Sequence, residues 1–292
     1  FLGPNGAGKS TTMNIITGCL SATSGQVTID GHDIFEEPKE AKRAIGYLPE
    51  IPPLYTNETP EEYLKFVAEA KGLKGKEMDR QIEGVISQTR IQNVRKRLIS
   101  KLSKGYRQRV GIAQALLGNP KVIILDEPTV GLDPIQIIEI RDLIKQLGKN
   151  HTVILSSHIL SEVQAICEKI LIIAHGKLVA FDQPDKLESQ LLSANEISFK
   201  TDAPESDVRE ALSTVEHITE LTVETTENIL SAHIKTDAKD IHAVSKEIFF
   251  AFAKRNQALL ELTLKRASLE DIFLELTETE DPAKATEGGE QS

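Results

Sequence analysis

Residues 3–10 of this sequence have the types and spacing needed to hold a phosphorylated ligand. They read Gly-Pro-Asn-Gly-Ala-Gly-Lys-Ser, which fits the pattern G-x-x-x-x-G-K-[ST] of a phosphate-binding loop. Glycines have no Cβ, so backbone N–H groups can converge on an anion. The helix predicted from Ser10 to Thr17 would direct its positive end at that anion. The predicted binding residues are Gly3, Pro4, Asn5, Gly6, Ala7, Gly8, Lys9, Ser10 and Thr11.

Two carboxylates follow a strand that must lie near this loop. Residues 122–125 are an apolar run bounded by prolines, which is typical of a buried parallel strand, and Asp126 and Glu127 come directly after it. Ligands bind at the carboxyl ends of such strands. We therefore expect Asp126 to hold Mg²⁺ together with the Ser10 hydroxyl, and Glu127 to orient or deprotonate an attacking water.

A lysine and a histidine complete the predicted site. Lys9 would supply a mobile cation for the β- and γ-phosphates. His158 follows a second apolar run, residues 152–155, and would reach the same edge of the sheet. A single histidine is more often structural, but its place after a second such strand favours a role in the site.

Length and composition limit the class of protein that this sequence can encode. The 292 residues predict about two domains, and 40% hydrophobic with 27% charged residues is typical of a globular protein rather than a collagen or a disordered chain. No window approaches the ~20 apolar residues of a membrane helix. Cys19 and Cys167 fit no disulfide framework or metal-ligand spacing, which favours a reducing compartment.

The net charge of −10 is concentrated after residue 190, whereas the part before it is close to neutral. Neither part has the basic excess of a nucleic-acid binder, so we expect no nucleic-acid partner. The change in charge also predicts two units joined near residue 190. The chain begins with Phe1-Leu2, which resembles the last step of a strand entering the loop, and we expect a few dozen preceding residues to be missing.

Several motifs in order make residues 1–190 resemble the ATP-binding subunits of ABC transporters. Residues 102–108 (Leu-Ser-Lys-Gly-Tyr-Arg-Gln) resemble the family signature LSGGQ, and residues 131–133 (Gly-Leu-Asp) resemble the D-loop. His158 resembles the switch histidine. Glu50 occupies the Q-loop position, where the family usually has Gln.

This resemblance implies a mechanism that needs two copies of the ATPase, with ATP between the loop of one and the signature of the other. Ser103, Lys104 and Gly105 would form that signature contact in trans, Asp133 would belong to the D-loop, and Glu50 would offer oxygen to Mg²⁺. Lys104 departs from the family's glycine, and Glu50 adds a negative charge. The aromatic residue that stacks on adenine in the family would lie upstream of this sequence.

Residues 52–118 resemble the family's helical subdomain, in which Thr59-Pro-Glu-Glu62 predicts a capped helix start. By the same resemblance, a permease would dock on the segment around residues 51–55. Ser103 is a good N-cap for a helix that we expect to run to Leu117.

Residues 195–276 alternate between strand and helix periods in the order βαββαβ, which predicts a ferredoxin-like domain. Ile197 and Phe199 alternate as in a strand near the start of this segment, and Leu260, Leu262 and Leu264 return to a period of two near its end. A final helix is predicted from Ser268 to Leu276, and residues 277–292 form an acidic tail that we expect to be disordered. The expected role is structural or regulatory, for example in dimerisation.

The predicted fold class is therefore α/β: a P-loop NTPase of the ABC ATPase type with a helical subdomain, followed by a small α+β ferredoxin-like domain. The arrangement resembles type-2 exporters, including multidrug-type and gliding-motility-associated members. It implies ATP and Mg²⁺, a separate integral-membrane permease, a homodimer, and a place on the cytoplasmic face of a bacterial membrane. Two alternatives remain open: a non-transport ABC ATPase acting on DNA or ribosomes, and a nucleotide-gated adaptor with little turnover.

Overall fold

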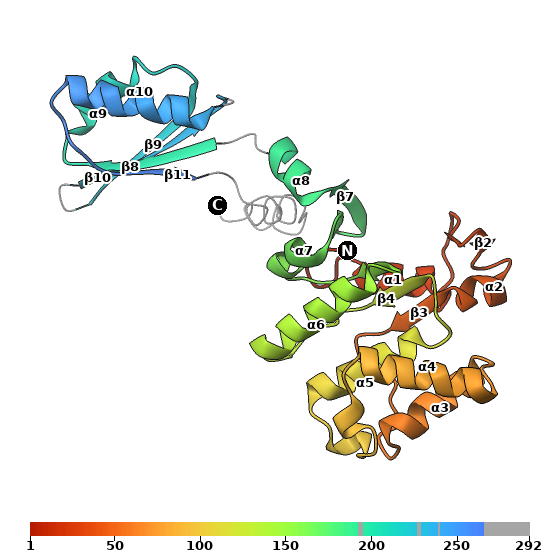
Figure 1. Ribbon diagram of the computed structural model, residues 1–292. Coiled ribbons are helices and arrows are strands. Elements are labelled where there is room, and N and C mark those ends of the chain that lie inside the picture. The colour runs from red at the N-terminus through yellow and green to blue at the C-terminus, as the bar shows by residue number, and fades with distance from the viewer. Residues whose placement is uncertain (192–194, 227–228, 239, 266–292) are drawn as a thin grey trace, which may run out of the picture. The chain divides into compact units, whose positions relative to one another are not determined.

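The structure is a computed structural model that describes residues 1–191, 195–226, 229–238 and 240–265 (Figure 1). Its contacts divide the chain into two units between Phe181 and Asp182. The sequence placed this junction near residue 190. The difference arises because helix α8 (Pro184–Leu191) groups with the second unit.

A parallel sheet organises the first unit. Strands β3 (Ile45–Leu48), β4 (Val122–Leu125) and β5 (Thr152–Leu155) pair in parallel in that order, so the two apolar runs form the predicted strands. Leu2 extends the sheet through parallel bridges to Ser157 and to Ile172 of β6 (Ile170–Ala174). The carboxyl ends of β4 and β5 and the step after Leu2 therefore share one edge.

Helices and hairpins connect these strands. Helix α1 (Lys9–Ile16) follows the glycine loop, α6 (Pro134–Leu147) joins β4 to β5, and α7 (Leu160–Ile166) follows β5. A turn through His175 and Gly176, both with positive φ, leads from β6 into β7 (Lys177–Asp182). The remaining elements before β3 are β1 (Thr28–Ile29), β2 (His32–Asp33) and α2 (Pro38–Arg43).

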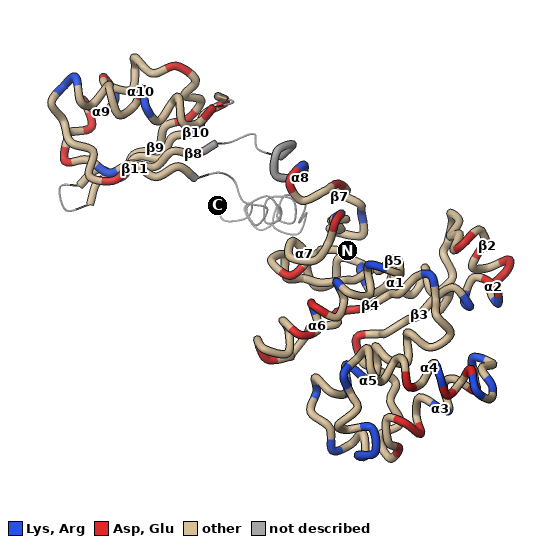
Figure 2. Tube along the Cα trace, viewed as in Figure 1, with Lys and Arg blue, Asp and Glu red and all other residues tan. Residues whose placement is uncertain are grey.

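A group of helices lies between β3 and β4 in the chain. It contains α3 (Pro60–Ala70), α4 (Gly75–Gln88) and α5 (Lys104–Leu116), which pack side by side (Figure 1). Short 3₁₀ turns at Gln92–Val94 and Ile99–Lys101 join α4 to α5. Thr59 and Glu62 form the predicted capping box of α3. Both signs of charge occur along α3 and α4 (Figure 2).

Arg95 ties two of these helices together. Its guanidinium lies 2.8 Å from Glu61 of α3 and 2.6 Å from Glu83 of α4. A planar guanidinium can serve two carboxylates at once. Arg95, the first of three consecutive basic residues at 95–97, therefore contributes to the packing of the helices.

The second unit is an antiparallel sheet with helices. The elements after α8 are β8 (Asn195–Thr201), α9 (Glu205–Leu212), β9 (Ile218–Thr226), β10 (Ile229–Thr236), α10 (Ile241–Lys254) and β11 (Leu259–Lys265). The strand order is β11-β8-β10-β9. The six elements follow the predicted order, and Ile197 and Phe199 lie in a strand as predicted and are buried. The rings of Phe199 and Phe252 meet edge to face, 5.1 Å apart, in the core.

The three leucines with a period of two in the last strand, Leu260, Leu262 and Leu264, do not share one environment. Leu260 is 54% exposed, whereas Leu259 packs against the core with Leu262 and Leu264. The pairing of β11 with β8 shifts register between Leu259 and Glu261, as in a β-bulge. An extra residue of this kind reverses the alternation on one side of the shift. The helix predicted over residues 268–276 and the acidic tail at 277–292 lie outside the described residues.

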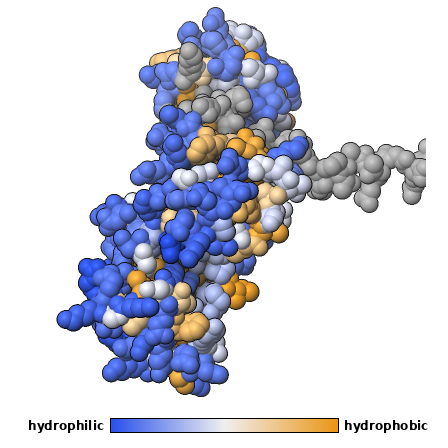
Figure 3. Space-filling view, turned by 90° about the vertical axis from the view of Figure 1, so that its right-hand side faces the viewer, coloured by the Kyte–Doolittle hydropathy of each residue, from blue (hydrophilic) through white to orange (hydrophobic). Residues whose placement is uncertain are grey.

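Within the described ranges, every helix is too short or too polar to span a bilayer. The face seen in Figure 3 is mostly hydrophilic, with hydrophobic side chains scattered over it in small groups. Cys19 and Cys167 are both free thiols, in agreement with the absence of a disulfide framework in the sequence.

Candidate functional site

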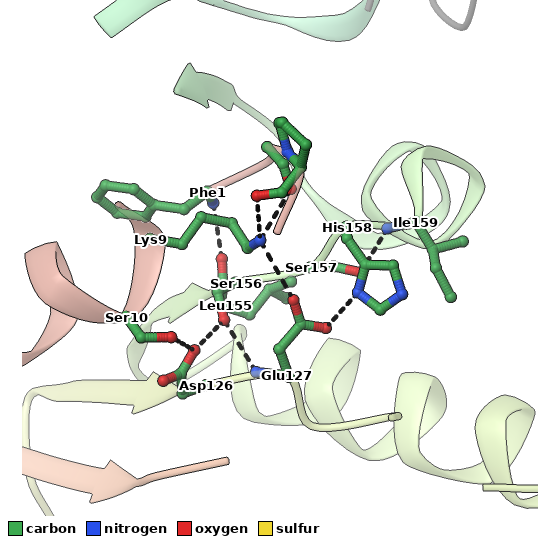
Figure 4. Close-up of polar contacts among 12 residues, drawn as sticks. Phe1, Lys9, Ser10, Asp126, Glu127, Leu155, Ser156, Ser157, His158 and Ile159 are labelled. Atoms are coloured by element: carbon green, nitrogen blue, oxygen red, sulfur yellow. Dashed lines mark hydrogen bonds and ion pairs between the residues drawn. The ribbon is translucent and has the colours of Figure 1, made fainter. Parts of the chain in front are cut away.

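The glycine loop wraps around the end of the Lys9 side chain. Lys9 Nζ donates to the carbonyl oxygens of Gly3 at 2.8 Å and Pro4 at 3.2 Å, and lies 3.6 Å from Glu127 Oε1 (Figure 4). Gly6 and Gly8 have φ values of 81° and 103°, which side chains with a Cβ rarely adopt. These residues therefore form the expected loop, and the ammonium group of Lys9 faces the carboxylate of Glu127.

A cavity of about 330 Å³ opens beside this loop. It is lined by Asn5, Gly6, Gly8, Lys9, Ser10, Thr11, Glu50, Glu127, Val130 and His158. Loop, strand-end and histidine residues that are far apart in sequence thus border one space. Gly3 and Ala7 are buried in the loop instead, and a Cβ at Gly3 would lie 2.4 Å from the carbonyl oxygen of Ile173.

Ser156 connects the two predicted carboxylates. Asp126 Oδ1 accepts hydrogen bonds from Ser10 Oγ at 3.3 Å and from Ser156 Oγ at 2.5 Å. Ser156 Oγ also accepts the backbone N–H of Glu127 at 2.9 Å, and its side chain is fully buried (Figure 4). The sequence analysis did not single out Ser156. The available signal was a polar residue directly after the strand at residues 152–155.

Glu127 is held in an unusual conformation against His158. Its φ is 47°, in the left-handed region that a non-glycine residue enters at a cost. Glu127 Oε2 lies 3.0 Å from His158 Nδ1, and because a carboxylate can only accept, Nδ1 carries the proton in this contact. Contacts with Ser156, Lys9 and His158 hold this strained residue in place.

Tyr47 connects β3 to α1, the helix that follows the glycine loop. Burial raises the pKa of Tyr47 to about 12, and the nearby charge of Asp126 adds to the shift. The phenol therefore stays protonated and donates to Asn14 Oδ1 at 3.3 Å, which joins β3 to α1. Glu50 follows the same strand and is an exposed residue at the cavity.

Comparison with known proteins identifies the family. Residues 1–130 match the family described as ABC transporter. The linearmycin resistance ATP-binding protein LnrL of Bacillus subtilis (strain 168) is 33% identical over 278 residues, covering 95% of this chain and 88% of LnrL. The chain belongs to the ATP-binding proteins of the ABC transporter family.

Two further proteins resemble this ABC ATP-binding chain. The bacitracin transport ATP-binding protein BcrA of Bacillus licheniformis is 44% identical over 205 residues, covering 67% of this chain. The chain spans 66% of the length of BcrA, just under two thirds, and 32% or less of some longer relatives. The dimeric ATP-binding cassette MJ0796, solved in a post-hydrolysis state with ADP and Pi, is 27% identical with a TM-score of 0.56, covering 62% of this chain and 83% of that one.

The residues that resemble the ABC signature lie at the start of α5. Ser103 is the N-cap, and its Oγ accepts the N–H of Tyr106 at 3.4 Å, as predicted from its type. The helix ends at Leu116, one residue before the predicted end. A Cβ at Gly105 would lie 2.4 Å from Gln136 Oε1, so a larger residue there would require the Gln136 side chain of α6 to move.

Within this one ABC chain, the residues that resemble the signature border a different cavity from the glycine loop. Ser103, Gly105 and Asp133 line a second cavity of about 570 Å³, which shares no lining residue with the first among the described residues. Asp133 caps α6 by accepting the N–H of Gln136 at 2.9 Å. Lys104 Nζ lies over Gly131, where a Cβ would approach it to 2.3 Å. The residues that resemble the signature and those that resemble the D-loop are therefore neighbours of one another.

Proposed function

We propose that this chain binds and hydrolyses ATP and so energises a separate integral-membrane permease that exports its cargo. The observation that carries the proposal is the placement of Glu127 between Lys9 and His158 at the cavity beside the glycine loop. BcrA and LnrL are named for bacitracin transport and linearmycin resistance, which supports export by a type-2 exporter system. The cargo itself would be selected by the permease.

The phosphates of ATP would bind in the loop of residues 3–11. The backbone N–H groups of the loop and of the first turn of α1 would donate to them. Lys9 would exchange its contacts with the carbonyls of Gly3 and Pro4 for the phosphate oxygens, which bind a cation more strongly because they are charged. Phosphate binding would therefore release the Lys9 ammonium from the two carbonyl oxygens of the loop.

The donor set beside the loop fits Mg²⁺. Ser10 Oγ and Asp126 Oδ1 lie 3.3 Å apart and are the hard oxygen ligands that this ion prefers. The described residues contain no cluster of three or more His, Cys, Asp or Glu suited to a metal, so phosphate and water oxygens would supply the other ligands. When bound, Mg²⁺ neutralises charge on the phosphates. Glu50 would contribute through its carboxylate at the same cavity.

Glu127 would act as the base toward the attacking water. The proton of that water would pass to a carboxylate oxygen of Glu127, while Nδ1–H of His158 holds Oε2 in place. His158 would sense the γ-phosphate from the same position. Phosphoryl transfer needs mainly positioning and charge stabilisation, which these side chains supply.

A second copy of the chain would complete the site. Ser103, Lys104 and Gly105 at the start of α5 would contact the γ-phosphate of ATP bound to the partner, with Asp133 beside them. Their separation from the first cavity supports this arrangement, as does the dimeric state of MJ0796. We infer a homodimer that binds the permease on the cytoplasmic face of a bacterial membrane.

We also propose that residues 1–190 form the ATPase domain, with residues 52–118 as its helical subdomain, and that residues 195–276 form a ferredoxin-like domain. The βαββαβ order and the strand order β11-β8-β10-β9 support the latter assignment. The role of this domain would be structural or regulatory.

Phosphate release by the full chain with Mg²⁺ and ATP tests the proposal. We expect turnover that rises more steeply than linearly with protein concentration, because two copies form each site. ATP binding without turnover, in the presence and absence of the permease, would favour the nucleotide-gated adaptor instead. Salt-sensitive binding to nucleic acid would favour the non-transport ATPase.

A further inference from the structure

A buried carboxylate lies directly behind the proposed catalytic pair. Glu162 belongs to the first turn of α7 and is only 3% exposed. Its Oε2 accepts a hydrogen bond from Thr129 Oγ1 at 2.5 Å and lies 3.4 Å from the donor Ser157 Oγ. Its other oxygen, Oε1, lies 3.6 Å from Arg141 Nη2. None of these residues lines the first cavity.

The two hydroxyls come from the two segments that carry the site. Thr129 is two residues after Glu127, and Ser157 immediately precedes His158. Ser157 Oγ also accepts the N–H of Ile159 at 3.0 Å, so the residues on either side of His158 are hydrogen-bonded to each other (Figure 4). A single carboxylate oxygen thus joins the loop after β4, which carries Glu127, to the loop after β5, which carries His158.

The buried Glu162 side chain has a partner of opposite charge as well as hydroxyl donors. A buried carboxylate requires compensation by charge and hydrogen bonds. Arg141 of α6 supplies the opposite charge, while Arg141 Nε is buried with no hydrogen-bond partner in the described part of the chain. Neutralising Glu162 would leave the Arg141 charge without its partner and weaken the acceptor that serves two hydroxyls, because hydrogen bonds to a charged oxygen are the stronger ones.

We propose that Glu162 is a positioning residue for ATP hydrolysis. It fixes the separation of Glu127 and His158 by holding Thr129 and Ser157 on one oxygen, and it touches neither the phosphate loop nor the nucleotide cavity. This inference rests on the proposed ATPase function. It predicts that Glu162 affects the rate of hydrolysis and leaves the affinity for ATP unchanged, because the loop around Lys9 keeps its own contacts.

The test measures kcat and KM for ATP, the binding of a fluorescent ATP analogue, and thermal unfolding of full-chain variants. Glu162→Gln is close in shape and removes the charge. Thr129→Val removes the hydroxyl donor while Glu162 keeps Arg141, and Thr129→Ser restores the donor. Asp142→Asn removes an exposed carboxylate from α6 and is the matched control.

We expect kcat to fall about tenfold or more in Glu162→Gln and Thr129→Val, with KM within about twofold, since small misplacement of reacting groups is costly. Thr129→Ser should recover most of the rate, and Asp142→Asn should match the wild type. The double variant Glu162→Gln/Thr129→Val should lose less than the product of the single losses, because both act through one contact.

A kcat of Glu162→Gln within twofold of the wild type would overturn the inference while leaving the ATPase function intact. So would equal losses in Thr129→Ser and Thr129→Val, because a merely structural effect would not depend on the hydroxyl. Parallel loss of ATP-analogue binding in Glu162→Gln would also overturn it. Absence of hydrolysis by the wild type with its permease would contradict both the inference and the proposed function.

Discussion

Glu127 and His158 lie 31 residues apart in sequence, yet Glu127 Oε2 is 3.0 Å from His158 Nδ1. The contact follows from topology, because β4 and β5 are adjacent parallel strands and each residue follows the end of its strand. The cost of the left-handed φ at Glu127 is tolerated where its side chain meets Lys9 and His158. The geometry gives Glu127 a fixed orientation before a substrate binds.

Replacing this carboxylate should separate binding from turnover. Glu127→Gln keeps the shape of the side chain but cannot take a proton from water, so turnover should fall by about a hundredfold or more. Affinity for ATP should be retained, because the loop residues are unchanged. Phosphate release and equilibrium binding of ATP measure the two effects. Turnover near that of the wild type would remove Glu127 from the role of base.

Ser156 should matter for stability as well as for hydrolysis. Ser156→Ala removes the donor to Asp126 and the acceptor of the Glu127 N–H, both buried. Leaving such a group unpaired costs about 1–3 kcal/mol, so urea unfolding should show a loss of that order. Ser161→Ala, at an exposed serine of α7, is the control and should change stability little. Equal stability of the two variants would show that the Ser156 contacts contribute nothing.

The negative charge at Glu50 should weaken nucleotide binding. Glu50 lines the cavity that would take the phosphates, so Glu50→Gln removes a repulsion and should lower KM for ATP about two- to fivefold. The Mg²⁺ concentration at half-maximal rate should rise, because the variant also loses the carboxylate that would contribute to the Mg²⁺ site. Glu69→Gln, an exposed carboxylate on α3, controls for net charge. Identical Mg²⁺ titrations for Glu50→Gln and the wild type would contradict this role.

The second unit should unfold independently of nucleotide binding. Phe252 is fully buried against Phe199, whereas Phe249 on the same helix is 52% exposed. Phe252→Ala should destabilise this unit by about 3–5 kcal/mol, and Phe249→Ala should cost far less. Calorimetry with and without ATP would resolve the transitions. A Phe252→Ala variant whose ATP affinity falls in proportion would show that the two units are energetically coupled.

Patterns that depend on local chemistry were predictable. The glycine loop, the strand at 122–125 and the capping box at Thr59 each follow from the residues of one short segment. Ser156 was not predicted, because serine is common in loops and only the fold brings it to Asp126. Glu162 was not predicted either, because only the fold brings its carboxylate to Thr129 and Ser157. Leu260 is exposed because the pairing of β11 with β8 shifts register beside it. The alternation of residues along a single strand carries no information about such a shift in pairing.

The central claim is that a second copy supplies the signature to each ATP. Sedimentation equilibrium of Glu127→Gln tests it most directly, because bound ATP should persist in that variant. We predict a monomer without nucleotide and a dimer at saturating ATP with Mg²⁺. Adding Ser103→Arg should abolish the dimer while ATP still binds the glycine loop, since Ser103 lines a different cavity. A dimer that survives Ser103→Arg, or no dimer at saturating ATP, would contradict the account.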